Sequence, residues 1–429
     1  MDMKVLCTGD IHIGRRPASV PAGADPQVWS TGRFFERLVD YAIRESVDVL
    51  AVSGDIIDKS NRFFEAAAPL ETGLRRLATA GIDTVAVAGN HDFDALPRFV
   101  DHVQPERFTL LGRGGRWESV HIVRDGIARI RFDGWSFPDE HVRENPLRHY
   151  DLPATHIPVI GLLHADFEEL DSVYAPIRAI DLHLDQVTCW LLGHIHKPGM
   201  VKETLPFAFY PGSPQALHAG ETGTHGPWLL DFDLAGPLRP QHIPLAATRF
   251  DRVPFDITGV DTESDFQARA AVSVRGHVNA VRDSAVMCPN HLAIRLQAAG
   301  RTACLSVLQK FAMALLAQEN QWEYAGCSIA LDAIDFDAVR PCYDLDELAR
   351  GAGPLAVLSR LLLALEGGAQ STEIELLITA TRERMVRGMG QPVFSALPAD
   401  RPTDAEVAAV LARQGYRTLD ILLAQKAVS

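Results

Sequence analysis

Two short motifs in the chain each place a pair of metal-type ligands two residues apart. Asp10 and His12 follow one apolar run, and His194 and His196 follow another. In an extended segment, side chains two residues apart point to the same side, so each pair can present two ligands to one centre. Carboxylate and imidazole together suit first-row divalent ions better than magnesium or calcium alone. The two motifs therefore predict a transition-metal site.

Three further ligand-type residues each follow an apolar, strand-like run of their own. They are Asp55, Asn90 and His164. With the two pairs they make seven ligands, which is too many for one ion and natural for two. We assign the carboxylate of Asp55 to the place between the ions. Two dications about 3.5–4 Å apart bind phosphate oxygens and lower the pKa of a shared water, so the predicted chemistry is hydrolysis of a phosphoester.

Two residues beside these ligands are predicted to act in catalysis. His91 directly follows Asn90 and must point elsewhere if Asn90 is a ligand. It can protonate the leaving oxygen or stabilise the negative charge that develops there. Asp58 lies three residues after Asp55, and we expect it to accept a hydrogen bond from His91 and fix the tautomer of that imidazole.

Each motif taken alone has an ordinary structural explanation. Asp-x-His occurs in loops, and Gly-Asp and Gly-Asn are common in turns. A single histidine after a strand, such as His164, is usually structural. The prediction depends on all five motifs occurring in one chain, each at the end of a strand-like run.

The elements that must position these residues alternate between strand-like runs and helical patterns. Short apolar runs precede the ligands, and the patterns at 30–45 and 65–80 are typical of amphipathic helices. This alternation predicts an α/β layered domain, with the ligands at the carboxyl ends of its strands. Residues 105–157 and 201–245 are expected to form irregular strands and loops.

The second part of the chain has a different pattern and carries no chemical motif. Residues 251–345 are predicted to be mixed α/β and residues 346–429 helical. Apolar faces in the helical part, which include Leu362 and Val407, can either pack an internal core or dock on a partner.

Helix signals in this last stretch are local. Pro354 can begin a helix that ends before Gly367. Two capping boxes are predicted, Thr372 with Glu375 and Thr403 with Glu406.

Composition limits how the protein can bind nucleic acid. The 429-residue chain has a formal net charge of -14, which argues against a surface that coats DNA by general electrostatics. Any DNA contact must depend on a local basic patch, on bound metal ions or on a partner. The length indicates two or three domains.

The chain also lacks the patterns of secreted and membrane proteins. It begins with a strand-like segment and no signal-peptide layout, and no apolar run approaches the roughly 20 residues of a membrane span. The six cysteines form no CxxC pair. We expect a soluble, cytoplasmic protein with reduced thiols and no membrane contact.

The order D-x-H, GD-x-x-D, GNHD, H, GHIH resembles the calcineurin-like metallophosphoesterase superfamily. The segments Gly193–Pro198 (GHIHKP) and Tyr210–Gln215 (YPGSPQ), followed by Gly220-Glu221, are similar to the SbcD-type exonucleases of SbcCD and Mre–Rad complexes. Protein phosphatases of the superfamily have GD-x-x-DRG and GNHE, so GNHD argues against that class. Asp58 stands where many archaeal relatives have a second histidine, which leaves any role tied to that histidine in doubt.

The resemblance implies a fold, a metal centre and partners. The fold is α/β, a four-layer metallophosphoesterase sandwich of two β-sheets flanked by helices, with a small α/β capping domain and C-terminal helices. The domains implied are a nuclease domain (1–250), a capping or DNA-recognition-like domain (251–345) and a helical region that docks on an SMC-like ATPase (346–429). By resemblance His91 is catalytic and two ions, usually Mn²⁺, are bound. Their ligands would be Asp10, His12, Asp55, Asn90, His164, His194 and His196.

Three functions are consistent with these residues. The leading hypothesis is a metal-dependent DNA nuclease of the double-strand-break repair type, which acts with a Rad-like ATPase or as a homodimer. The first alternative is a small-molecule phosphodiesterase or phosphatase, which would not need the last 180 or so residues. The second is a non-enzymatic component that retains the metals, which the complete ligand set argues against.

Overall fold

The structure is a computed structural model whose described residues fall in two compact units. The first unit takes in residues 1–252, 277–294 and 321–332, and the second takes in 253–276, 295–320 and 333–429. The described residues are 3–15, 30–61, 66–184, 186–232, 238–284, 289–302, 305–318, 321–324, 326–341, 343–367, 371–389 and 402–428.

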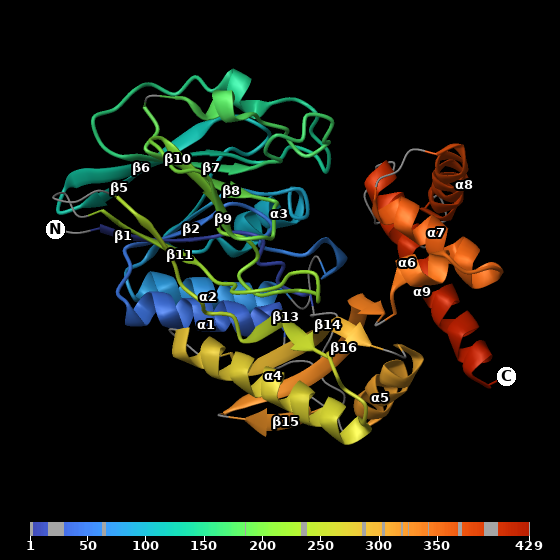
Figure 1. The fold of residues 1–429 in the computed structure, drawn as a ribbon. Helices are drawn as coiled ribbons and strands as arrows, with labels where there is room; N and C mark the ends of the chain where they lie inside the picture. Colours follow the sequence, from blue (N-terminus) through green and yellow to red (C-terminus); the bar gives the residue numbers. More distant parts are fainter. Residues whose placement is uncertain are drawn as a thin grey trace. The chain divides into compact units, whose positions relative to one another are not determined.

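The first unit contains two six-stranded sheets (Figure 1). One sheet has the order β12-β11-β1-β2-β3-β4, in which β1 to β4 are parallel and β11 is antiparallel to β1. Its strands are β1 (Met3–Thr8), β2 (Val49–Val52), β3 (Asp83–Ala86), β4 (Phe108–Leu110), β11 (Trp228–Phe232) and β12 (Pro240–His242). Because β1, β2 and β3 are parallel, their carboxyl ends lie at one edge of the sheet.

The second sheet has the order β5-β6-β7-β8-β10-β9, with β6, β7, β8 and β10 parallel. Its strands are β5 (Glu118–Arg124), β6 (Ile127–Trp135), β7 (Val159–His164), β8 (Cys189–Gly193), β9 (Gly199–Lys202) and β10 (Phe207–Tyr210). Within 105–157, the region expected to form irregular strands and loops, β5 and β6 form a long antiparallel pair whose register shifts between Ile122 and Val123. Half-buried, charged residues on β5 and β6 weakened their apolar pattern in the sequence.

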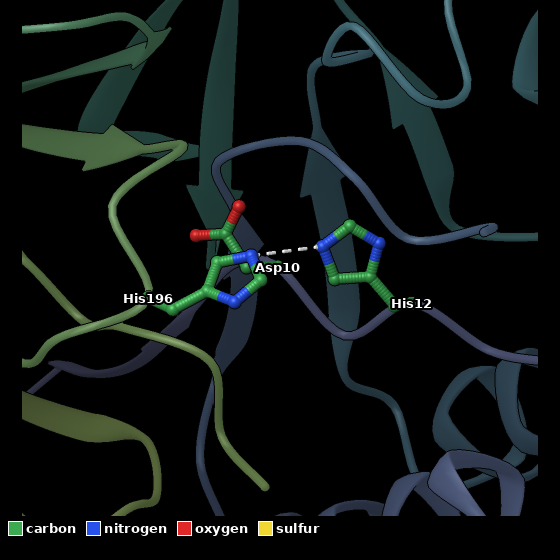
Figure 2. Close-up of side chains that lie close together, drawn as sticks. All are labelled: Asp10, His12 and His196. Atoms are coloured by element: carbon green, nitrogen blue, oxygen red, sulfur yellow. Dashed lines mark hydrogen bonds between the residues drawn. The ribbon is translucent and has the colours of Figure 1, made fainter. Parts of the chain in front are cut away.

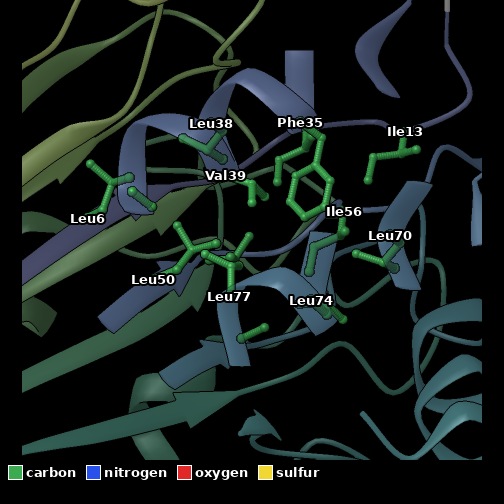
Figure 3. Packing of buried hydrophobic residues seen from close by; sticks show 14 of the residues in the cluster. Leu6, Ile13, Phe35, Leu38, Val39, Leu50, Ile56, Leu70, Leu74 and Leu77 are labelled. Carbon is green, nitrogen blue, oxygen red and sulfur yellow. The ribbon is translucent and has the colours of Figure 1, made fainter. Parts of the chain in front are cut away.

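Alternating side chains of the first sheet fill two different cores. Leu6 and Leu50 face helices α1 (Thr31–Arg44) and α2 (Ala67–Thr79) (Figure 3). Val5 belongs instead to the core shared with the second sheet. Helix α3 (Ala95–Val103) packs on the same core as α1 and α2. This division follows from the period of two along a strand.

The outer face of the second sheet buries a third core, formed by Trp135, Trp190 and other apolar residues. Loops with the 3₁₀ turns η2 (Pro146–His149) and η3 (Ala179–Leu182) contribute Leu147 and Leu182 to it. The fold class is therefore confirmed as α/β, with two sheets between helices on one side and a loop layer with short helical turns on the other.

The helical predictions for the first unit are confirmed. Ser30 caps α1, since its hydroxyl accepts a hydrogen bond from Arg33 N, and the helix ends at Arg44 as its apolar pattern does. Helix α2 occupies most of the predicted 65–80. Together these helices cover the face of β1 and β2 that points away from the second sheet.

The rest of the described chain forms a third sheet and the helices α4 to α9. The sheet has the order β13-β14-β16-β15. Its strands are β13 (Thr248–Asp256), β14 (His291–Thr302), β15 (Gln321–Tyr324) and β16 (Cys327–Pro341), and the helices are α4 (Glu263–Ser284), α5 (Leu305–Ala317), α6 (Leu345–Ala349), α7 (Pro354–Glu366), α8 (Thr372–Met389) and α9 (Asp404–Val428).

Caps of the C-terminal helices largely follow the sequence. Helix α7 runs from Pro354 to the residue before Gly367, as predicted. Glu406 and Thr403 form the expected reciprocal box at α9. At α8 the capping hydroxyl belongs to Ser371, which accepts from Ile374 N, so the predicted Thr372 box is wrong by one residue.

Among the described residues, no helix combines the length and apolarity that a membrane crossing requires. Cys7, Cys189 and Cys327 are buried free thiols, as expected. The other three cysteines lie outside the described residues: Cys288, Cys304 and Cys342.

Candidate metal centre

The predicted ligands come together within the first unit, at the carboxyl ends of strands from both sheets. Asp10 and His12 follow β1, and Asp55 follows β2. His164 is the last residue of β7, and His194 directly follows β8. The loops that carry Asp10 and Asp55 are joined by the hydrogen bonds Asp10 N to Gly54 O and His12 N to Asp55 O. Parallel strands thus bring ligands from distant segments to one place.

Four of these residues have a backbone conformation that non-glycine residues rarely adopt. The φ angles are 50° for Asp10, 49° for His12, 52° for Asp55 and 99° for His194. Left-handed conformations of this kind cost on the order of 1–3 kcal/mol each and persist where the surrounding structure imposes them. Their concentration at one place is typical of a functional site.

Figure 2 shows one group of possible ligands, Asp10, His12 and His196, whose ligand atoms lie within 4.8 Å of one another. The Nε2 atoms of His12 and His196 face each other at 3.1 Å. Two imidazole nitrogens approach so closely when a proton or a cation lies between their lone pairs. The contact is therefore consistent with a hydrogen bond and with a shared cation.

A second group consists of Asp10, Asp55 and His164, all buried. Asp55 Oδ2 lies 3.4 Å from His164 Nε2 and 3.8 Å from His12 Nε2, so it sits between the two groups. Asn90 completes the cluster, because its Oδ1 lies 2.9 Å from His164 Nε2 and 3.3 Å from His194 Nδ1.

Charges within the cluster oppose the effects of burial. Burial alone would raise the pKa of Asp55, but the attraction and hydrogen bond of His164, with the charges of His12 and His91, lower it below its usual range. Burial alone would lower the pKa of His164, but Asp55 and Asp10 raise it. The buried carboxylate of Asp55 is therefore held ionised by the imidazoles around it.

His91 and Asp58 lie next to these groups, with geometry that differs from the expected pairing. Asp58 Oδ2 is 3.7 Å from His91 Nδ1 but 3.3 Å from His12 Nδ1, and no hydrogen bond to His91 Nδ1 is present among the described residues. The His91 ring packs edge-on against His12 with centroids 4.7 Å apart. Burial lowers the pKa of His91, although Asp55 and Asp58 act in the opposite direction. Asp58 thus lies nearer to His12 than to His91, and His12 Nδ1 also has no hydrogen-bond partner among the described residues.

The side chains of the cluster differ in exposure. Asp10, His12 and His164 are fully buried. The side chains of His91, His194 and His196 are 30%, 19% and 25% exposed. Among the described residues of the cluster, these three imidazoles are therefore accessible to solvent.

Asp92 is a functional residue that the sequence reasoning missed. Its fully buried carboxylate accepts hydrogen bonds from Ile56 N (2.7 Å), Ile57 N (3.2 Å) and Gly89 N (2.8 Å). It therefore ties the loop of Asp55 to the loop of Asn90. Its place at the end of the GNHD motif was the available signal.

Two further carboxylates contact the exposed imidazoles of His196 and His194, and the sequence reasoning missed these as well. Glu221 Oε1 accepts a hydrogen bond from His196 Nδ1 at 2.7 Å. Asp166 Oδ1 lies 3.3 Å from His194 Nε2, on the side of the ring opposite Asn90. Burial opposes it, but the hydrogen bond from His196 lowers the pKa of Glu221 to about 2, so this carboxylate is ionised at neutral pH.

Comparisons with known proteins agree with this geometry. The calcineurin-like phosphoesterase family matches residues 3–198. The chain is 30% identical over 221 residues to the uncharacterized metallophosphoesterase YhaO of Bacillus subtilis, a match that covers 47% of this chain and 49% of that protein. It is 24% identical to the DNA double-strand break repair protein Mre11 of Methanopyrus kandleri, with 62% of each chain covered.

A third relative is the SbcD component of the nuclease SbcCD of Rhodobacter capsulatus, 27% identical over 57% of this chain and 69% of that protein. The chain spans about half of the Bacillus protein and less than two thirds of the Methanopyrus protein. The matched family region holds all of the grouped Asp and His side chains that could bind a metal ion. The chain therefore carries a calcineurin-like metallophosphoesterase domain, and its strand-end cluster of Asp and His residues is the candidate metal site of that domain.

Proposed function

We propose that this protein is a metal-dependent DNA nuclease of the double-strand-break repair type that works with an SMC-like ATPase. The observation that carries the proposal is the cluster itself, two ligand groups that share Asp10 and open to solvent beside His91. Such a site suits a phosphodiester, which presents two non-bridging oxygens and a leaving oxygen.

The proposed ligands of the two ions are the seven predicted from the sequence. Asp10, His12 and His196 contribute to one ion, and Asp55, Asn90, His164 and His194 to the other. Asp55 is the proposed bridge, because its Oδ2 lies between His12 and His164. Divalent ions bound there, Mn²⁺ in this proposal, would polarise the phosphate and supply a hydroxide nucleophile at neutral pH.

His91 and Asp58 act on the substrate side of this centre. The partly exposed ring of His91 can donate a proton or a hydrogen bond to the leaving oxygen. The Asp55 carboxylate holds the backbone of His91 in place, because Asp55 Oδ1 accepts a hydrogen bond from His91 N at 2.9 Å. Asp58 orients the ring of His12 and adds negative charge near His91. These roles keep chemistry and metal binding on different side chains.

DNA as the substrate is supported by relatives rather than by surface charge. Mre11 and SbcD are a DNA repair protein and a nuclease component by name, whereas the net charge of this chain is -14. Phosphate attraction must therefore come from the bound cations and from the ATPase partner. The competing proposal, a small-molecule phosphodiesterase, uses the same site, and the similarity to the uncharacterized metallophosphoesterase YhaO does not distinguish the two.

Each part of the chain has a proposed role in a complex of the nuclease with its ATPase. Residues 1–250 would be the nuclease domain, 251–345 a capping domain and 346–429 the region that binds the ATPase. Leu362 and Val407, for which the sequence left both core packing and docking open, are buried, and α7 packs on α9. Apolar side chains that remain exposed there are Val357, Leu376, Leu377, Val386 and Ile421, and these are better candidates for the partner contact.

Activity on three substrates tests the proposed function. Purified protein with Mn²⁺ should degrade linear DNA and cleave bis-p-nitrophenyl phosphate, and His91→Ala should abolish both activities. Turnover of the small diester and of cyclic nucleotides without any cleavage of linear DNA, with or without the ATPase, would overturn the nuclease proposal in favour of the small-molecule alternative.

Leu376→Glu should reduce capture of the ATPase at least tenfold while it leaves cleavage of the small diester unchanged. Unchanged capture by this variant would refute the docking role of the exposed residues.

A further inference from the structure

Glu221 lies 25 residues beyond His196, and its carboxylate contacts that ring on the side away from the metal cluster. The distance from Glu221 Oε1 to His196 Nδ1 is 2.7 Å, which is the shortest contact of the imidazole. The Glu221 side chain is only 8% exposed. A short hydrogen bond to a nearly buried carboxylate restricts the ring far more than a solvent contact does.

The loop between the two residues holds this carboxylate in place. Glu221 Oε2 accepts hydrogen bonds from Leu217 N (2.6 Å) and from the hydroxyl of Ser213 (3.3 Å). Ser213 N in turn donates to His196 O at 2.9 Å. The segment 213–221 therefore wraps around His196 and fixes its backbone and its ring together.

The hydrogen bond also determines which nitrogen of His196 faces the cluster. An ionised carboxylate can only accept, so Nδ1 must carry the proton in this contact. In the neutral ring Nε2 is then left with its lone pair, and this atom points at His12 Nε2, 3.1 Å away (Figure 2). A histidine must present such a lone pair to bind a metal ion.

We propose that Glu221 is a positioning residue that holds His196 in the Nδ1–H tautomer and directs its Nε2 into the metal centre. The inference rests on the proposed role of His196 as a ligand. It does not depend on the substrate, because tautomer and metal affinity are measured without DNA. It can fail while the nuclease proposal stands, and the reverse also holds.

A purely structural role for Glu221 would give a different result. Loss of the contacts to Leu217 and Ser213 would loosen the loop and lower stability, but it would not by itself change the tautomer of His196. His218 offers a matched control, since its Nε2 lies 3.3 Å from the same Oε1 while its side chain is 50% exposed. His218→Ala removes this second contact and leaves the hydrogen bond to His196.

The experiment uses the full-length protein with three variants: Glu221→Ala, Glu221→Gln and His218→Ala. Mn²⁺ affinity is measured by calorimetry, and the tautomer of His196 in metal-free protein is measured by long-range ¹H–¹⁵N correlation, with the signal assigned from His196→Gln. Glu221→Ala should weaken Mn²⁺ binding about 10- to 100-fold, the usual effect of removing a carboxylate behind a ligating histidine. It should also give a mixture of His196 tautomers.

The other two variants separate charge from shape. The amide oxygen of Glu221→Gln can still accept from Nδ1, so the tautomer should be retained while Mn²⁺ binding weakens about 10-fold. His218→Ala should match the wild type in both measurements. Wild-type Mn²⁺ affinity in both Glu221 variants would overturn the proposal, as would an unchanged tautomer in Glu221→Ala. If Glu221→Ala does not fold, Glu221→Gln alone decides the matter by its Mn²⁺ affinity.

Discussion

Gly89→Ala should damage the metal centre without removing any ligand. Gly89 precedes Asn90, and a Cβ at this position would lie 2.2 Å from Asp55 Oδ1 and 2.8 Å from both His164 Cε1 and Nδ1. Ordinary contact begins at 3.4 Å, so the Asp55 carboxylate must move by about 1 Å to accept a methyl group. The substitution therefore displaces two proposed ligands at once.

The size of the effect follows from this displacement. A misplacement of about 1 Å in a catalytic arrangement costs on the order of 100-fold in rate. Inserting a methyl group into a packed core costs about 1–3 kcal/mol in stability. Gly89→Ala should thus lose about 100-fold or more in Mn²⁺-dependent turnover and bind less metal, while most of the protein stays folded.

Hydrolysis of bis-p-nitrophenyl phosphate, metal analysis after dialysis and urea unfolding measure these three quantities. Gly199→Ala is the matched control, because nothing lies within 4 Å of a Cβ built at Gly199, and it should keep wild-type turnover. Gly89→Ala with wild-type turnover and metal content would refute the argument that this glycine is required by the ligands packed against it.

Three further substitutions separate metal binding, catalysis and loop support. His91→Ala should keep its metal and lose about 100- to 10,000-fold in turnover; loss of metal in this variant would show that His91 is a ligand. Asp55→Asn should lower the content of both ions, since its Oδ2 lies between His12 and His164, and retention of one ion at full occupancy would exclude the bridging role. Asp92→Ala leaves three buried N–H groups unpaired and should lower the free energy of unfolding by about 3 kcal/mol or more; a loss below about 1 kcal/mol would mean that the loops hold together without it.

Local order in the chain determined the strands, the first helices and the identity of the ligand-type residues. The apolar runs before Asp10, Asp55 and His164 became strands because a period of two is a property of neighbouring residues. Ser30 and the pair Thr403 and Glu406 became helix caps for the same reason. Parallel strands then bring their carboxyl ends to one edge, so convergence of the ligands was also predictable.

Contacts between segments far apart in the chain were decided by packing. Asp58 was expected to pair with His91, but the left-handed backbone of His12 (φ 49°) brings that ring nearer to the same carboxylate. The extent of the β5–β6 pair was hidden because β5 is largely exposed and has a weak apolar pattern.

Packing also determined the contacts of the carboxylates that support the site. Asp92 became a link between two loops, and Glu221 a partner of His196, through contacts that span 36 and 25 residues. Sequence periodicity records which face of an element is buried. Which buried side chain meets which depends on the distances between packed elements, and these are fixed only when the two sheets close on their common core.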